Sequence, residues 1–201
     1  MRTALVAALL SVGIAAQAAS PVPRPAKELT ILDLSGKQTL LSSYKGKVVM
    51  LACVFTTCPH CQHLSQFVMS KLQSDLGARG FQALDVAFND EVNTPNQAAN
   101  AQVAASFQKQ FAPVYPVGFA PRESIMSFLG LSVMDAHWVV PQIVIMDRKG
   151  VIRAQSAAGG TEELQTESYL RTLLDGLLKE GATPASNTKK PAAPKADKKA
   201  S

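Results

Sequence analysis

Residues 46–63 read GKVVMLACVFTTCPHCQH, and this stretch decides the fold. Its first part, Gly46 to Phe55, is a nearly unbroken apolar run, which predicts a strand buried on both faces. The segment after the second cysteine, Gln62 to Leu76, predicts a helix. The cysteines Cys58 and Cys61 therefore lie where a buried strand passes into a helix.

The spacing of the two cysteines favours redox chemistry. Two intervening residues let both sulfurs share the first turn of the helix, where they can close a small disulfide ring or open it. The Cys58 sulfur lies over the unpaired N–H groups and the positive dipole end of that helix. This position favours the thiolate, which is the form that attacks disulfides. A C-x-x-C motif between a strand and a helix is a much stronger redox signal than the motif alone.

The rest of the chain alternates predicted strands and helices. Strands at 29–34 and 38–41 flank Ser35-Gly36-Lys37, which predicts a β-hairpin. Further strands are expected at 80–88, 115–119, 142–146 and 151–155, helices at 101–111, 123–129 and 162–179, and a loop at 89–100. This order predicts an α/β fold, with a central mixed sheet, helices on both faces and an N-terminal β-hairpin.

Both ends of the chain differ from its middle. Met1 and Arg2 precede an apolar run that is too short for a membrane span, and Ala16-Gln17-Ala18 matches a cleavage signal. An uncleaved N-terminal anchor is the alternative reading of this run. We expect a signal peptide over 1–18, a linker over 19–28, the folded domain over 29–180 and a disordered Lys/Pro/Ala-rich tail over 181–201.

The net charge is concentrated in the tail. Of the formal +5 of the chain, Arg2 contributes +1, and five lysines and one acid in the tail contribute +4. The predicted domain is therefore close to neutral, so no nucleic-acid partner is expected. We expect a periplasmic or otherwise exported protein that is soluble after signal cleavage. The tail is either a solvated extension or a weak contact with the cell envelope.

Three cysteines leave one outside the motif. In an oxidising compartment a C-x-x-C pair persists as a disulfide unless another thiol system reduces it. Cys53 lies inside the apolar strand and is predicted to be a small buried hydrophobic residue. The sequence contains no phosphate-binding loop and no second C-x-x-C, and we expect neither a cofactor nor a resident metal.

Three stretches together resemble the thioredoxin-fold superfamily, and more closely its exported TlpA-like, redoxin-type branch. They are LTILDLSGKQTLLSSYKGKVVML at 29–51, CPHC at 58–61 and VVPQIVIMDRKGVI at 139–152. The resemblance extends over about 29–178. It implies a hairpin that feeds the central strand, followed by the redox motif and a final β-hairpin.

The resemblance also implies site residues. Cys58 corresponds to the attacking thiolate and Cys61 to the buried resolving cysteine, which displaces the partner from the mixed disulfide. Pro141 corresponds to a proline held in cis beside the redox pair, and Val140 lines the surface that receives the extended chain of the substrate. His60, between the sulfurs, is expected to stabilise the thiolate and make the disulfide more oxidising.

The sequence departs from its relatives at several positions. Thr57 stands where many of them have tryptophan before the first cysteine. Ala52 stands where thioredoxin buries an acid, six positions before that cysteine, to manage the proton of the resolving thiol. The Pro-His dipeptide and the valine before Pro141 are DsbA-like, and DsbA is a strong oxidant.

We therefore expect an exported thiol–disulfide oxidoreductase that acts on protein cysteines and exchanges electrons with a membrane or soluble thiol partner. The scaffold favours a reductase and the dipeptide an oxidant; we prefer the reductase, with the direction of electron flow left open.

One alternative is a Sco-type copper chaperone using Cys58, Cys61 and His137, although such proteins space their cysteines by three residues. The other is a peroxiredoxin-like peroxidase, although Phe55 replaces the threonine of that pattern.

Overall fold

The computed structural model describes residues 21–112, 114–132 and 138–180. The predicted signal peptide over 1–18, the tail over 181–201 and His137 lie outside these residues. Within the described part, no helix is both long enough and apolar enough to cross a membrane.

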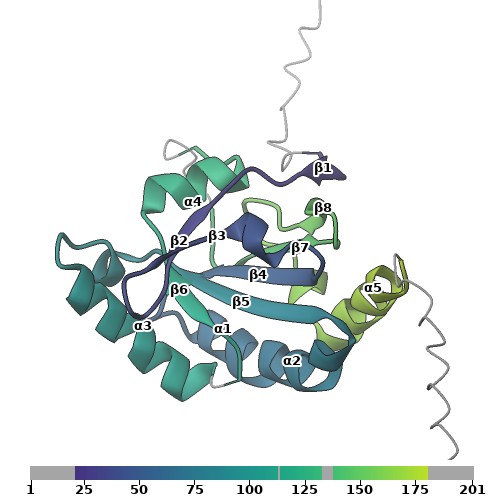
Figure 1. Cartoon of the computed structure of the whole chain (residues 1–201), viewed down its shortest axis with the longest axis horizontal. Helices are drawn as coiled ribbons and strands as arrows, with labels where there is room; N and C mark the ends of the chain where they lie inside the picture. Colours follow the sequence, from purple (N-terminus) through teal and green to yellow (C-terminus); the bar gives the residue numbers. More distant parts are fainter. Residues whose placement is uncertain (1–20, 113, 133–137, 181–201) are drawn as a thin grey trace, which may run out of the picture.

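A mixed sheet of eight strands forms the centre of the molecule, in the order β1-β8-β7-β4-β5-β6-β2-β3 (Figure 1). The strands are β1 (Arg24–Pro25), β2 (Thr30–Leu32), β3 (Gln38–Leu40), β4 (Val48–Val54), β5 (Phe81–Ala87), β6 (Val117–Phe119), β7 (Gln142–Met146) and β8 (Val151–Gln155). Strand β4 pairs in parallel with β5 and antiparallel with β7. The predicted hairpin is present, with β2 antiparallel to β3.

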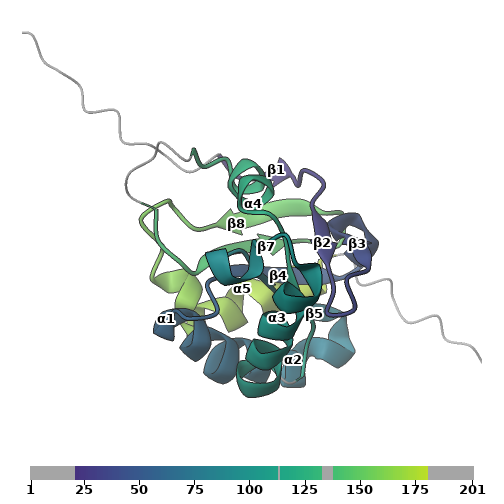
Figure 2. The same cartoon turned by 90° about the vertical axis from the view of Figure 1, so that its left-hand side faces the viewer.

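Helices cover both faces of this sheet, as Figures 1 and 2 show. The α-helices are α1 (Pro59–His63), α2 (Ser70–Leu76), α3 (Gln97–Phe111), α4 (Arg122–Leu129) and α5 (Glu167–Lys179). A π-helical segment, η2 (Leu64–Met69), joins α1 to α2 in one continuous helical stretch. Short 3-10 helices are η1 (Leu41–Tyr44), η3 (Gly77–Arg79), η4 (Asp90–Val92) and η5 (Glu163–Gln165). The predicted α/β fold class is confirmed.

Strand β4 divides the interior into two hydrophobic cores. All seven of its residues are buried, as expected for a Val/Leu-rich strand covered on both faces. Because side chains alternate along a strand, Met50 and Ala52 join the core beneath α1, α2, α3 and α5, together with Cys61. Leu51 and Cys53 face the other core, beneath α4 and η1. Cys53 has no exposed surface, which confirms the expectation for this residue.

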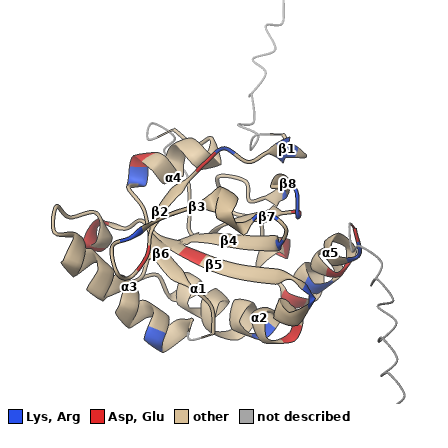
Figure 3. Cartoon of the chain, in the orientation of Figure 1, with Lys and Arg blue, Asp and Glu red and all other residues tan. Residues whose placement is uncertain are grey.

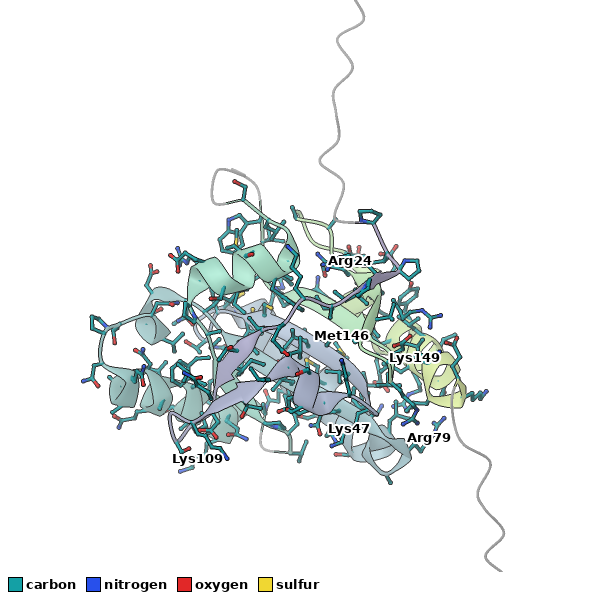
Figure 4. The ribbon with its side chains drawn as sticks, turned by 45° about the horizontal axis from the view of Figure 1, so that its top comes forward. Arg24, Lys47, Arg79, Lys109, Met146 and Lys149 are labelled. Atoms are coloured by element: carbon teal, nitrogen blue, oxygen red, sulfur yellow. The ribbon has the colours of Figure 1, made fainter. Side chains whose placement is uncertain are left out.

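The structure differs from the sequence-based expectations near two segment boundaries. Part of the stretch 19–28, expected as a linker, forms β1, which pairs with β8 at the edge of the sheet. The Arg24 side chain donates to the Gln155 side chain at 2.6 Å, and its place at this edge can be followed in Figure 4. Helix α3 begins at Gln97 rather than at 101, because the side chain of Asn96 accepts a hydrogen bond from Ala99 N and caps the helix.

Candidate active site

Cys58 lies at the junction of the central strand and the helical stretch that follows it. It is the N-cap residue of α1, and Pro59 occupies the first helical position, where its missing N–H costs nothing. Cys58 N donates to Phe55 O at 3.1 Å, and Gln62 N donates to Cys58 O at 3.0 Å. The backbone therefore turns sharply from strand into helix at the first cysteine, as the sequence predicts.

The loop before Cys58 is fixed by buried polar side chains. Asn89, just beyond β5, accepts from Thr56 N at 3.2 Å and donates to Thr56 Oγ1 at 2.9 Å. Gln62 reaches back from α1 and donates to Thr56 O at 2.9 Å. These bonds join the loop to both the neighbouring strand and the helix, so the position of Cys58 is held from two sides.

The two cysteines of the motif differ in their access to solvent. Cys58 is partly exposed, whereas Cys61 is buried with no exposed surface. All three cysteines are free thiols in this structure. Burial raises the pKa of the Cys61 thiol well above its usual range, although a hydrogen bond with the Phe55 backbone opposes the shift, while Cys58 and the charge of Asp85 add to it. Cys61 therefore stays protonated until a reaction draws its proton away.

The helix surface beside the motif carries both nearby histidines. His60 is exposed on α1, between the two cysteines. His63 is also exposed, and its ring contacts that of Phe67 with 5.0 Å between the centroids. Phe67 is 57% exposed and presents an apolar ring to solvent beside His63.

Val140 and Pro141, the predicted substrate-binding pair, lie where the chain enters β7. The Val140–Pro141 peptide is cis, Pro141 is buried, and Val140 is partly exposed. Cys58 and Val140 both border the core that contains Cys61. Cys58, Cys61 and Val140 therefore share one of the two hydrophobic cores. Val139, which precedes Val140, is 46% exposed.

Gln142 ties this entry segment to the loop after β8. Its side-chain nitrogen lies 2.8 Å from Val139 O, 3.2 Å from Ala157 O and 3.0 Å from Ala158 O. Val139 N also donates to Ala158 O at 2.9 Å. Gln142 is fully buried and pairs with Cys53 across β4 and β7. It holds the backbone that carries Val140 against the neighbouring loop.

Asp85 is a buried acid that the sequence analysis passed over. It lies within β5, directly opposite Ala52 of β4, and has no exposed surface. In Figure 3 the acidic colour on β5, whose only acid is Asp85, marks this position inside the sheet. Burial raises the pKa of the Asp85 carboxyl to about 7, although hydrogen bonds from Ser65 and Tyr115 pull it down. The one signal in the sequence is a single acid in an otherwise apolar strand.

Aromatic side chains pack on the other face of the sheet, near the same end. The ring centroids of Phe55 and Phe88 each lie 5.7 Å from that of Trp138. His137, which the copper alternative requires, is outside the described residues. Within the described ranges, no group of three His, Cys, Asp or Glu side chains is arranged to hold a metal ion.

Comparisons with known proteins agree with this architecture. A model of the AhpC/TSA family matches residues 22–155, whereas no curated protein matches the chain. A proposed protein disulfide isomerase from Bacteroides thetaiotaomicron has a TM-score of 0.60 and 24% identity, covering 82% of this chain and 94% of that one.

Two structures from Chlorobium tepidum are similar to the same degree. A proposed thiol:disulfide interchange protein DsbE has a TM-score of 0.58 and 23% identity, covering 77% of this chain and 96% of that one. A thiol:disulfide interchange protein of the thioredoxin family has a TM-score of 0.58 and 22% identity, covering 80% and 99%. These likenesses confirm the thioredoxin-like fold.

Proposed function

The chain belongs to the AhpC/TSA family, and we propose that it is an exported thiol–disulfide oxidoreductase that acts on protein cysteines through Cys58 and Cys61. The observation that carries the proposal is the pairing of a partly exposed sulfur with a buried one on the first turn of the same helix. The first sulfur is open to a partner, and the second is shielded from solvent.

The proposed reaction has two steps. The Cys58 thiolate, at the N-terminus of the helical stretch, attacks one sulfur of a substrate disulfide. A mixed disulfide forms, and the other substrate sulfur leaves as a thiol. Cys61 then attacks the Cys58 sulfur, the substrate leaves fully reduced, and the enzyme holds a Cys58–Cys61 disulfide. A membrane or soluble thiol partner returns two electrons to the enzyme.

We place the substrate chain along Val140 and Pro141. Val139 is half exposed, Val140 is partly exposed, and Cys58 borders the same core as Val140. Gln142 holds this segment in place through the Val139 carbonyl. An extended substrate lying here brings its disulfide to Cys58, which is the mode of strand-like recognition that uses backbone groups of both chains.

In this proposal His60 tunes the reduction potential of the Cys58–Cys61 couple, and the predicted signal peptide over 1–18 directs export. His60 is exposed and stands between the two cysteines in the sequence, where a side chain that stabilises the thiolate makes the disulfide more oxidising. We take the reaction to run as reduction of the substrate, because the scaffold is TlpA-like. The Pro-His dipeptide, which is DsbA-like, favours the opposite direction. Export follows the cleavage signal before Ala19.

Trapping of mixed disulfides tests the assignment of the two cysteines. We expect Cys61→Ser to accumulate a covalent complex with a reactive protein disulfide, because the resolving thiol is absent, and Cys58→Ser to accumulate none. Both variants lose catalytic reduction of insulin, followed by turbidity. Cys53→Ala is the matched control. This variant should keep the activity, because the Cys53 side chain belongs to the core on the other face of the sheet from Cys61. Activity retained in Cys58→Ser would contradict the proposal.

A further inference from the structure

Several segments meet at the end of the molecule opposite the redox motif. Strand β4 begins at this end, and Cys58 follows its other end. Because β5 is parallel to β4 and β7 antiparallel, β5 begins and β7 ends here too. The Arg148 side chain joins them to the end of α5, since it donates to Gly46 O at 2.8 Å, Arg79 O at 3.0 Å and Leu178 O at 3.5 Å. We call the segments 26–28, 45–47, 79–80, 147–153 and 175–180 the basal end.

Positive charge is in excess at the basal end. These segments carry eight basic and four acidic side chains, although the folded domain as a whole is close to neutral. Figure 4 shows Lys47, Arg79 and Lys149 on this side of the molecule. Three of the four acids are neutralised by ion pairs, which are Asp175 with Arg79 and both Asp147 and Glu180 with Arg153. The remaining cations therefore outnumber the remaining acid.

Six cations of the basal end have no acidic partner in the described part of the chain. They are Lys27, Lys45, Lys47, Arg148, Lys149 and Lys179, and all five lysines are exposed. Glu28 is the one acid of these segments outside an ion pair, and its Oε1 accepts from Leu29 N and Ser42 N at 3.1 Å each. The exposed lysines therefore present a net positive charge to solvent.

The other end of the sheet carries the opposite charge. Strands β5 and β6 run parallel to β4, and β8 is antiparallel to β7, which is itself antiparallel to β4. All three strands therefore end on the side where Cys58 lies. The segments that follow them, 88–96, 120–123 and 156–166, contain one cation against five acids: Arg122 against Asp90, Glu91, Glu123, Glu162 and Glu163. The domain is thus basic at the basal end and acidic at the redox end.

The chain enters its Lys-rich tail at the basal end. Helix α5 ends there, because Arg148 bonds to Leu178 O and Arg153 pairs with Glu180, the last described residue. The sequence beyond 180 adds five lysines and a single acid, Asp197. Its net charge has the same sign as that of the basal end, so the tail and the folded surface attract the same kind of partner.

An apolar cavity of about 170 Å³ lies among these lysines. Its lining combines apolar side chains with two exposed lysines: Leu41, Val49, Met146, Lys27 and Lys45. The acids in its wall are occupied, since Glu28 accepts from backbone N–H groups and Asp147 pairs with Arg153. A cavity of about 150 Å³ holds one benzene ring, so this one has room for a short stretch of hydrocarbon. A ligand that joins negative charge to hydrocarbon fits these surroundings better than a purely ionic one.

We propose that the basal end is an interaction surface for anionic phospholipids of a membrane. The exposed lysines bind headgroup phosphates, the tail adds its charge at the same surface, and the cavity lined by Lys27 and Lys45 accepts the apolar part of a lipid. Each cation contributes little and salt screens it, so such binding needs several cations on one face. In this orientation Cys58 faces away from the membrane and stays accessible to a protein partner. The proposal is independent of the reaction proposed above.

Co-sedimentation with lipid vesicles tests this surface. The chain from Ala19 on, which contains every described residue and the tail, is mixed with vesicles of phosphatidylglycerol and phosphatidylcholine, or of phosphatidylcholine alone. We expect binding to the anionic vesicles only, and its loss as the salt concentration rises towards about 0.5 M. Lys45→Glu/Lys149→Glu reverses two charges of the basal end and should weaken binding to the anionic vesicles by at least about tenfold.

A matched variant separates the basal end from net charge. Lys37→Glu/Lys109→Glu reverses two charges in the β2–β3 hairpin and on α3, away from β7 and β8 in the strand order, and should keep binding within about threefold. Equal binding by the two double variants, as when the tail alone binds, overturns the role of the basal end, and equal binding to both kinds of vesicle overturns the requirement for anionic lipid. Iodoacetamide should alkylate Cys58 equally fast with and without anionic vesicles; protection of Cys58 overturns the orientation.

Discussion

The two neighbours of β4 carry different kinds of buried polar side chain at the same level of the sheet. On the β5 side, Asp85 pairs with Ala52; on the β7 side, Gln142 pairs with Cys53. Because Ala52 and Cys53 are consecutive, the two side chains lie on opposite faces. Asp85 can ionise and contacts the segment that follows Cys61, whereas Gln142 is neutral and ties loop carbonyls together. One side of the central strand therefore responds to pH, and the other acts as scaffold.

The largest expected effect is on the β5 side. The Asp85 carboxyl has a pKa near 3.9 in an unfolded chain and about 7 in the folded protein, because burial disfavours its charge. Below about pH 4 both states are protonated. Between about pH 4 and 7 the unfolded chain loses the proton and the folded protein keeps it, so stability falls as pH rises. The total loss is on the order of 4 kcal/mol.

Asp85→Asn removes this slope. We expect the free energy of unfolding of the reduced variant, relative to the reduced wild type, to increase by on the order of 4 kcal/mol between about pH 4 and pH 8. Urea unfolding followed by tryptophan fluorescence measures it. Asp75→Asn is the control, because that exposed carboxylate is paired with Arg171 at the surface. If the free energies of unfolding of the wild type and Asp85→Asn change with pH in parallel, Asp85 does not make the β5 side of β4 sensitive to pH.

A substitution on the β7 side should change the free energy of unfolding by the same amount at every pH. Gln142→Leu removes the side-chain donor to Val139 O, Ala157 O and Ala158 O. Ala158 O and Ala157 O keep their bonds from Val139 N and Gly160 N, so Val139 O is the carbonyl that loses its donor. We expect a loss of about 1–2 kcal/mol in the free energy of unfolding, equal at acid and neutral pH. Chemical unfolding at several pH values checks this. A loss that varies with pH would break the contrast between Gln142 and Asp85.

The smallest expected effect concerns Ser65, whose hydroxyl bonds to Asp85 on the β5 side. Ser65→Ala removes a hydrogen bond that stabilises the ionised form of Asp85 most. We expect a loss of about 1.5–3 kcal/mol above the folded pKa of Asp85, falling towards about 1 kcal/mol in acid, where the bond is to a neutral group. The same unfolding series measures it. Ser74→Ala, an exposed serine on α2 that bonds only to a helix carbonyl, should change stability little at any pH.

Local sequence patterns predict the succession of strands and helices along the chain and the position of Cys58 and Cys61, because apolar runs and the C-x-x-C spacing are read within a few residues. The cluster of Asp85 with Ser65 and Tyr115 depends on long-range pairing instead. Its tyrosine lies 30 residues away along the chain and its serine 20, and no local pattern encodes the register that sets Asp85 beside Ala52.

The boundary differences have similar causes. The short strand β1 exists through pairing with β8, from which it is separated by most of the chain. The earlier start of α3 was open to prediction, since Asn96 is a favoured N-cap residue and a helix-forming run follows it. The π turn at Ser65 has no such local signal, because the hydrogen bonds that define it compete with an ordinary α-helical turn.

Equilibration with glutathione, followed by mapping of every disulfide by mass spectrometry, tests the central claim most directly. The account predicts that the oxidised protein contains a single Cys58–Cys61 disulfide, formed with the loss of two hydrogens, while Cys53 remains a free thiol. It also predicts that Cys61→Ser stops at a glutathione adduct on Cys58. Accumulation of that adduct in the wild type, with Cys61 still free, would contradict the assignment of a resolving cysteine and the account built on it.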